Sequence, residues 1–170
     1  DPDRIFSPEV LFALSDSQRG ELFEEYFDPS LAPNMVFRME TDLLEQTIYG
    51  GTGTGGNLDD YRCRSNWISS GSARYFYKYS DMTESGRIEN TMIPLLRLGE
   101  MYLIAAESQS NSLANGVSYI NTLRKNRGVS NLQTLTTTLL QYEYIREVYG
   151  EGQLFFMYKR MYSSIIQSNS

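Results

Sequence analysis

Residues 93–107 decide the fold, and they read IPLLRLGEMYLIAAE. Apolar residues recur at the three- and four-residue spacing of a helix, and Pro94 suits the first turn of one. The stretch therefore predicts a helix that begins at Pro94. Gly99 is small enough to let another helix approach closely. The predicted apolar stripe consists of Leu95, Leu98, Tyr102, Ala105 and Ala106.

Three further helices are predicted downstream of this stretch. The first ends in a basic cluster before Gly128, which suits the left-handed position that follows a helix. The second runs over about 135–149 after a threonine-rich start that can cap it, and the third over about 153–162. The predicted stripe residues of the first two are Leu113, Val117, Ile120 and Arg124, then Leu139, Tyr142, Ile145, Val148 and Tyr149. The last helix carries Leu154, Phe155, Phe156 and Tyr158.

The first 92 residues are richer in glycine and aromatic residues and predict a loop-rich part. The short apolar segment 10–14 favours a buried strand, although a helix is also possible there. Asp16 or Ser17 is a candidate cap for a helix over 18–27, and another short helix is expected near 40–48.

A small β-hairpin is expected between these early helices and the main helices. Residues 73–79 alternate in the manner of a strand, with three tyrosines on one side. A polar turn over 81–87 leads to 88–93, which is the predicted partner strand. The fold class is therefore mainly α with long loops and one small hairpin.

Composition bounds the function. A chain of 170 residues fits a single domain, here 1–170, with a loop-rich part at 1–92 and a helical scaffold at 93–162. A net charge of −6 argues against non-specific nucleic-acid binding. The chain has no histidine, which excludes Ser-His-Asp catalysis and histidine metal ligands. Cys63 is the only cysteine, so no internal disulfide forms, and no apolar run is long enough to span a membrane.

Two further motifs resemble known sites, one for dinucleotides and one for acid–base chemistry or calcium. Gly51, Gly53 and Gly56 match the glycine spacing of dinucleotide-binding loops, but no strand precedes them and no apolar helix follows. A mobile surface loop is the better interpretation of 50–56. Asp59 and Asp60 could serve acid–base chemistry or bind calcium, although adjacent side chains usually diverge and a solvated loop is favoured.

Four stretches together follow a family pattern: IPLLRLGEMYLIAAE at 93–107, YINTLRKNRG at 119–128, IREVYGEGQLFFMYKR at 145–160 and, less strongly, DRIFSPEVLFAL at 3–14. In these stretches the chain resembles the C-terminal region of the SusD/RagB family. Many members have arginine at the position of Leu154, aspartate at that of Met157 and alanine at that of Gly99. Cys63 lies mid-chain and cannot take the place of the family's lipidated N-terminal cysteine.

The resemblance implies a surface-exposed lipoprotein of the bacterial outer membrane with TPR-like helix packing. Such a protein binds glycans, or sometimes peptides, and delivers them to a TonB-dependent SusC/RagA-like transporter. It implies no enzyme activity, cofactor or metal. The charged motif residues are expected to form a structural network: Arg97, Glu100, Glu107, Arg124, Arg127, Arg146, Glu147, Glu151 and Arg160.

Aromatic side chains are the expected contacts for an oligosaccharide, since sugar rings stack on aromatic faces. The chain has 13 Tyr and 8 Phe. The candidate ligand residues are Trp67, Tyr61, Tyr75 and Tyr77, with Asp59 and Asp60 as hydrogen-bonding partners. The alternative function is a helical protein–protein adaptor without a small ligand, or a peptide-binding member of the same family. An enzyme with paired carboxylates, such as a glycosidase, is a third and weaker possibility.

Overall fold

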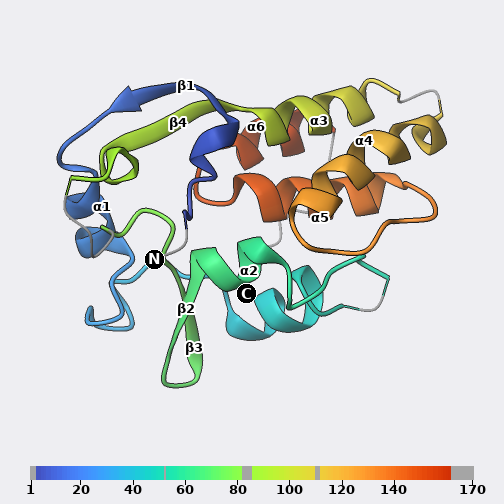
Figure 1. The fold of residues 1–170 in the computed structure, drawn as a ribbon. Helices are drawn as coiled ribbons and strands as arrows, with labels where there is room; N and C mark the ends of the chain where they lie inside the picture. The colour runs from blue at the N-terminus through green and yellow to red at the C-terminus, as the bar shows by residue number, and fades with distance from the viewer. Residues whose placement is uncertain (1–2, 52, 82–85, 110–111, 162–170) are drawn as a thin grey trace. The chain divides into compact units, whose positions relative to one another are not determined.

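The computed structural model describes residues 3–51, 53–81, 86–109 and 112–161 (Figure 1). The chain divides into two compact units. The first unit consists of Asp1–Thr41 and Arg62–Leu98, and the second of Asp42–Tyr61 and Gly99–Ser170. One domain over 1–170, with parts at 1–92 and 93–162, stays a prediction.

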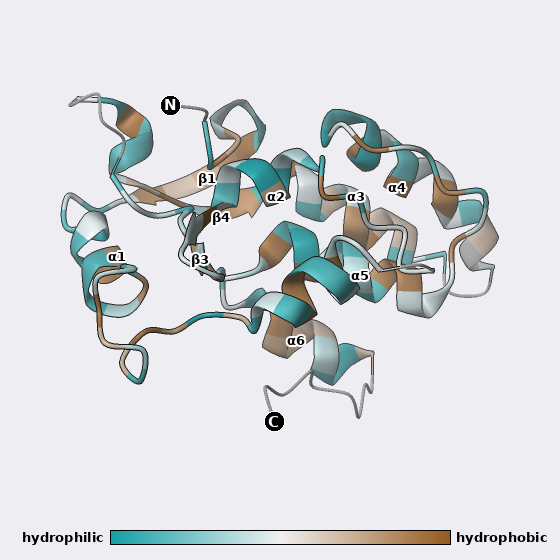
Figure 2. Ribbon diagram, turned by 90° about the horizontal axis from the view of Figure 1, so that it is seen from below, coloured by the Kyte–Doolittle hydropathy of each residue, from teal (hydrophilic) through white to brown (hydrophobic). Residues whose placement is uncertain are grey.

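A two-stranded ribbon in the first unit joins segments that are far apart in the sequence. Strand β1 (Val10–Ser15) runs antiparallel to β4 (Met92–Arg97), with Ala13 opposite Pro94 (Figure 1). Both strands are rich in hydrophobic residues (Figure 2). The strand predicted at 10–14 is confirmed, but its predicted burial is wrong, because Leu11, Phe12 and Leu14 are exposed.

Pro94 lies in β4, so the prediction that it opens a helix is wrong. Helix α3 (Leu98–Glu107) begins four residues later. Proline disfavours the helical conformation in the residue before it, here Ile93, and its missing N–H is tolerated on an edge strand. Leu95 and Leu98, expected on the buried stripe, are exposed instead.

The predicted hairpin exists, but its partner strand was wrong. Strand β3 (Ala73–Phe76) pairs antiparallel with β2 (Trp67–Ser70), not with 88–93. Gly71 opens the two-residue turn with a φ of 60°, a conformation that glycine adopts without strain. The sequence signal for this hairpin was the Gly71–Ser72 pair between two short strand-like segments.

The remaining elements of the first unit are short. Helix α1 (Arg19–Tyr26) confirms the helix predicted over 18–27, and it buries Phe23. The Asp16 carboxylate accepts the N–H of Gln18 at 2.8 Å just ahead of it. The other elements are η1 (Ser7–Glu9), η3 (Ile88–Asn90) and the body of α2 (Tyr61–Asn66), whose first residue belongs to the second unit.

The second unit holds the main helices. These are α3, α4 (Leu113–Asn126), α5 (Thr137–Val148) and α6 (Gln153–Arg160), together with the π-helical turn η2 (Leu43–Ile48). Helix α5 contacts α4, α6 and η2. Thr136 caps α5 by accepting the N–H of Leu139 at 3.2 Å, as its threonine-rich start predicted.

The core of the second unit is formed mainly by residues on these helices. Its buried apolar side chains include Leu44, Ile48, Leu103, Ile120, Leu123, Leu140, Tyr144, Ile145, Val148 and Met157. On α6 only Met157 is buried, while Phe155 and Phe156 are each 64% exposed. The sequence assigned neither ring to a face of this helix, and α6 turns the side that carries Met157 to the core.

The mainly α fold is confirmed, with short antiparallel ribbons as the β component. TPR-like packing of the helices stays a prediction. The predicted turn at 81–87 and the last residue of the helix predicted over 153–162 lie partly or wholly outside the described residues.

Candidate functional site

A short turn in the second unit presents Asp59 and Tyr61 at the surface. The side-chain Oδ1 of Asn57 accepts the N–H of Asp59 at 2.8 Å, and its carbonyl accepts the N–H of Asp60 at 3.1 Å. Asp59 is exposed, whereas Asp60 is 1% exposed and points into the protein. The two adjacent carboxylates therefore do not act on the same ligand from solvent.

The ring of Tyr61 rests on the backbone that follows α4. The N–H of Tyr61 donates to the carbonyl of Arg127 at 3.0 Å. Gly128 has a φ of 74°, and a Cβ there would lie 2.7 Å from the Tyr61 ring carbons, so the ring touches the glycine directly. About half of Tyr61, 51%, stays exposed. An aromatic ring fixed on one side and open on the other is suited to stacking.

Helix α5 holds the glycine-rich loop that leads to this turn. Arg146 donates from Nε to the carbonyl of Ile48 and from Nη2 to the carbonyl of Thr54, each at 2.8 Å. Thr54 is buried, so the interpretation of 50–56 as a mobile surface loop is wrong for this residue. The Arg146 side chain reaches the carbonyls of Ile48 and Thr54 because α5 packs against η2.

The other three candidate ligand residues lie in the first unit. Trp67 is 5% exposed and packs edge-to-face on Phe76, with ring centroids 5.3 Å apart. Tyr75 is half-buried and pairs with Ile68 across the hairpin. The guanidinium carbon of Arg4 lies over the ring of Tyr77, 4.3 Å from the ring centroid. Their part in ligand binding stays a prediction.

A buried ionic group joins α4 and α5. Oε1 of Glu143 accepts from Nη1 of Arg124 and, at 3.0 Å, from Nη1 of Arg146. All three side chains are almost fully buried. Both arginines were predicted to belong to the network, but Glu143 was not. The sequence does contain a signal for Glu143, because it lies three residues before Arg146, a spacing that pairs opposite charges on a helix.

A second buried pair connects the end of α4 with α5. Arg127 donates to Glu147 through Nη2 at 2.7 Å and Nε at 3.1 Å, with both side chains fully buried. A Cβ on Gly99 would lie 2.5 Å from Oε1 of Glu147, so this glycine makes room for the carboxylate. The expected close approach at Gly99 is thus made by a side chain of α5.

A third ionic group is partly exposed. Arg160 of α6 donates to Glu107 through Nε at 2.5 Å and Nη2 at 2.8 Å, and the Tyr144 hydroxyl donates to Glu107 at 2.6 Å. The Arg160 guanidinium holds the pKa of Glu107 below its usual value. Burial, and then the hydrogen bond to Glu107, raise the pKa of Tyr144. Of the remaining network residues, Arg97 is buried in the first unit, and Glu100 and Glu151 are half-buried in the second.

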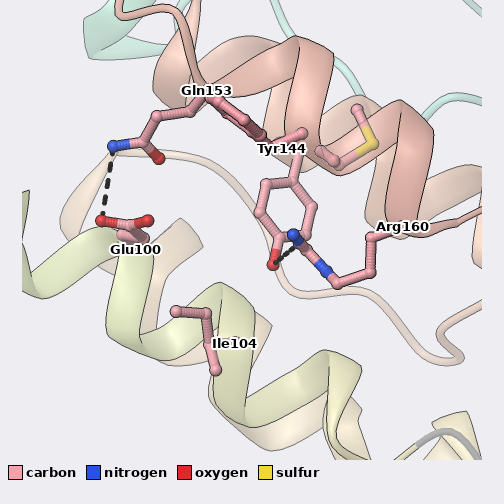
Figure 3. Close-up of a pocket in the computed structure, with 7 residues that line it drawn as sticks. Glu100, Ile104, Tyr144, Gln153 and Arg160 are labelled. Carbon is pink, nitrogen blue, oxygen red and sulfur yellow. Dashed lines mark hydrogen bonds between the residues drawn. The ribbon is translucent and has the colours of Figure 1, made fainter.

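A pocket of about 320 Å³ lies among α3, α5 and α6 (Figure 3). Sequence analysis did not predict it, because its lining comes from three helices and follows no single periodicity. The lining residues are Glu100, Ile104, Tyr144, Gln153, Phe156, Met157 and Arg160.

Among the described residues, no helix combines the length and hydrophobicity needed to cross a membrane. In the same part of the chain, no cluster of three or more His, Cys, Asp or Glu residues is placed to hold a metal ion.

Comparison with protein families gives one result. The model of the SusD family matches residues 22–167. The chain therefore belongs to the SusD/RagB family, whose members are generally binding proteins associated with nutrient uptake at the outer membrane. No curated protein and no solved structure matches the chain.

Proposed function

We propose that this chain is a non-catalytic, glycan-binding part of a cell-surface nutrient-uptake protein. It binds oligosaccharides and delivers them to a TonB-dependent SusC-like transporter of the outer membrane. The observation that carries the proposal is the family match over residues 22–167. The half-exposed Tyr61 ring and the exposed Asp59 beside it support glycan as the ligand class.

Tyr61 and Asp59 are the proposed glycan contacts of the six candidate residues. Tyr61 offers an apolar face to a sugar ring, and Asp59 offers carboxylate oxygens to sugar hydroxyls. Asp60 and Trp67 are buried, so we do not assign them a contact with the glycan. Tyr75 and Tyr77 are half-buried, so they are the second choice.

The experiment is a calorimetric titration of the 170-residue chain with a panel of neutral oligosaccharides. A stacking contact contributes on the order of 1 kcal/mol, so Tyr61→Ala should weaken binding by roughly 2- to 10-fold. Tyr119→Ala is the matched control, because Tyr119 is also a partly exposed tyrosine of the second unit but lies on α4. Its affinity should equal that of the parent chain.

The alternatives predict different results. If the parent chain binds none of the oligosaccharides, the glycan proposal is wrong, and a peptide ligand or an adaptor role takes its place. If Tyr61→Ala and Tyr119→Ala bind as tightly as the parent, glycan binding stands but the Tyr61 site does not.

A further inference from the structure

The pocket among α3, α5 and α6 has a second hollow beside it. The second hollow has a volume of about 300 Å³ and is lined by Ile104, Glu107, Ser108 and Arg160. Ile104 and Arg160 line both hollows, so the two adjoin at these side chains, and together they are called the groove below. Each hollow is at the small end of the volumes that bind small organic molecules.

One wall of the groove is fixed before any ligand arrives. Glu107 receives two hydrogen bonds from Arg160 and one from the Tyr144 hydroxyl, and Nη2 of Arg160 also lies 3.3 Å from that hydroxyl. Figure 3 shows Arg160 and Tyr144 pointing toward one another at the pocket. Such a preformed wall lowers the ordering cost of binding.

The rest of the groove combines apolar surface with neutral hydrogen-bonding groups. Met157 is buried, while Ile104 and Phe156 leave much of their surface open. At the other end, the Gln153 amide donates to Glu100 at 3.4 Å (Figure 3). Among the described residues this is the one hydrogen bond of the Gln153 side chain, so its amide oxygen remains an acceptor for a ligand.

The charge of the groove limits its ligand. The groove is lined by two carboxylates, those of Glu100 and Glu107, and by one guanidinium, that of Arg160. Arg160 already forms an ion pair with Glu107. An anionic ligand would meet net negative charge. A neutral polyol instead finds carboxylate, amide and hydroxyl groups for its hydroxyls and the Phe156 ring for its apolar face.

We propose that this groove is a second carbohydrate site, which takes two rings of a neutral oligosaccharide, one in each hollow, with Phe156 stacking on the ring in the first. The ligand class rests on the proposed function, but the site is different from that at Tyr61. Arg160 lies between the rings and can donate hydrogen bonds to both, whereas Glu107 lines the second hollow and contacts only the ring there.

The test compares two neighbouring phenylalanines. Phe155 and Phe156 are equally exposed at 64%, yet only Phe156 lines the pocket. The two variants are compared in a calorimetric titration with a neutral oligosaccharide that the parent chain binds. Phe156→Ala should weaken binding at the groove by roughly 2- to 10-fold and leave binding at the Tyr61 site unchanged. Phe155→Ala should leave the affinity of both sites unchanged.

A second measurement does not depend on any variant. In the parent chain with labelled methyl groups, saturating oligosaccharide should shift the NMR signals of the Ile104 and Met157 methyls and leave that of Met35, an exposed methionine of the first unit, in place. The inference is wrong if the Ile104 and Met157 signals stay in place, or if Phe155→Ala weakens binding as much as Phe156→Ala. If Tyr61→Ala alone weakens binding, the proposed function stands without this groove. If the parent binds no oligosaccharide, both proposals are wrong.

Discussion

Replacing the buried Glu143 by glutamine is the sharpest test of the ionic network. Glutamine keeps the shape of the side chain but removes the negative charge between Arg124 and Arg146. The three side chains are between 0% and 3% exposed, so water cannot compensate for the loss. The arginines keep their hydrogen bonds to carbonyls, such as that of Ser130, and the change therefore isolates charge compensation.

The magnitude follows from burial. Removing one partner of a buried ion pair costs about 3–5 kcal/mol, whereas an exposed pair contributes about 1 kcal/mol or less. For a chain of this size, each kcal/mol shifts the melting temperature by about 2–4 °C. Glu143→Gln should therefore lower the melting temperature by about 6–20 °C.

Glu107→Gln is the matched control. Glu107 also pairs with an arginine, but its side chain is 21% exposed and that of Arg160 is 49% exposed. We expect a melting temperature within about 4 °C of the parent. Both variants are measured by thermal and urea unfolding followed by far-UV circular dichroism.

Two results would refute this reasoning. One is a Glu143→Gln chain whose unfolding free energy lies within about 1 kcal/mol of the parent. The other is an equal loss in Glu143→Gln and Glu107→Gln, which would mean that burial does not set the energy of these pairs.

Three further predictions concern backbone space and pH. Gly99→Ala should destabilise the chain by about 1–3 kcal/mol in urea unfolding despite a better helix propensity, because its Cβ would meet Glu147 at 2.5 Å; a gain in stability would contradict this. Gly128→Ala should cost more than Gly152→Ala, since both have positive φ but only Gly128 has a ring within 3 Å of the new Cβ; equal urea midpoints would show that the ring moves away freely. The pKa of Glu107 is lowered below 4.5 by its arginine partner, so its contribution is present above that pH and lost as the pH falls through the folded-state value. Urea midpoints should accordingly fall more steeply on acidification in the parent than in Glu107→Gln, and identical slopes would exclude a role for this pair.

Local sequence signals were sufficient where an element depends on its neighbours in the chain. Gly128 follows the end of α4 with a φ of 74°, the left-handed conformation that was predicted for this glycine. Thr136 caps α5, as the threonine-rich start of this helix predicted. Of the motif residues, Arg124 pairs with Glu143, Arg127 with Glu147, and Arg146 with Glu143 within α5. These features need only helical spacing, capping chemistry and the pairing of opposite charges.

The candidate site was only partly predictable. Tyr61 and Asp59 are accessible as expected, but Asp60 and Trp67 are buried. Aromatic and acidic residues serve both surfaces and interiors, and composition does not tell which side of the chain faces the core. The groove beside Phe156 was missed because α3, α5 and α6 build it together.

By itself, the sequence determined the family and indicated the main helices. Tertiary structure alone decided that Pro94 lies in a strand, that β3 pairs with β2, and that Glu143 is the shared partner of two arginines. The physical reason is the distance along the sequence over which each feature is specified. A helix is specified by residues three or four positions apart. Strand pairing and burial depend on contacts between segments that are far apart in the sequence, and the local pattern of residues does not predict which segments meet.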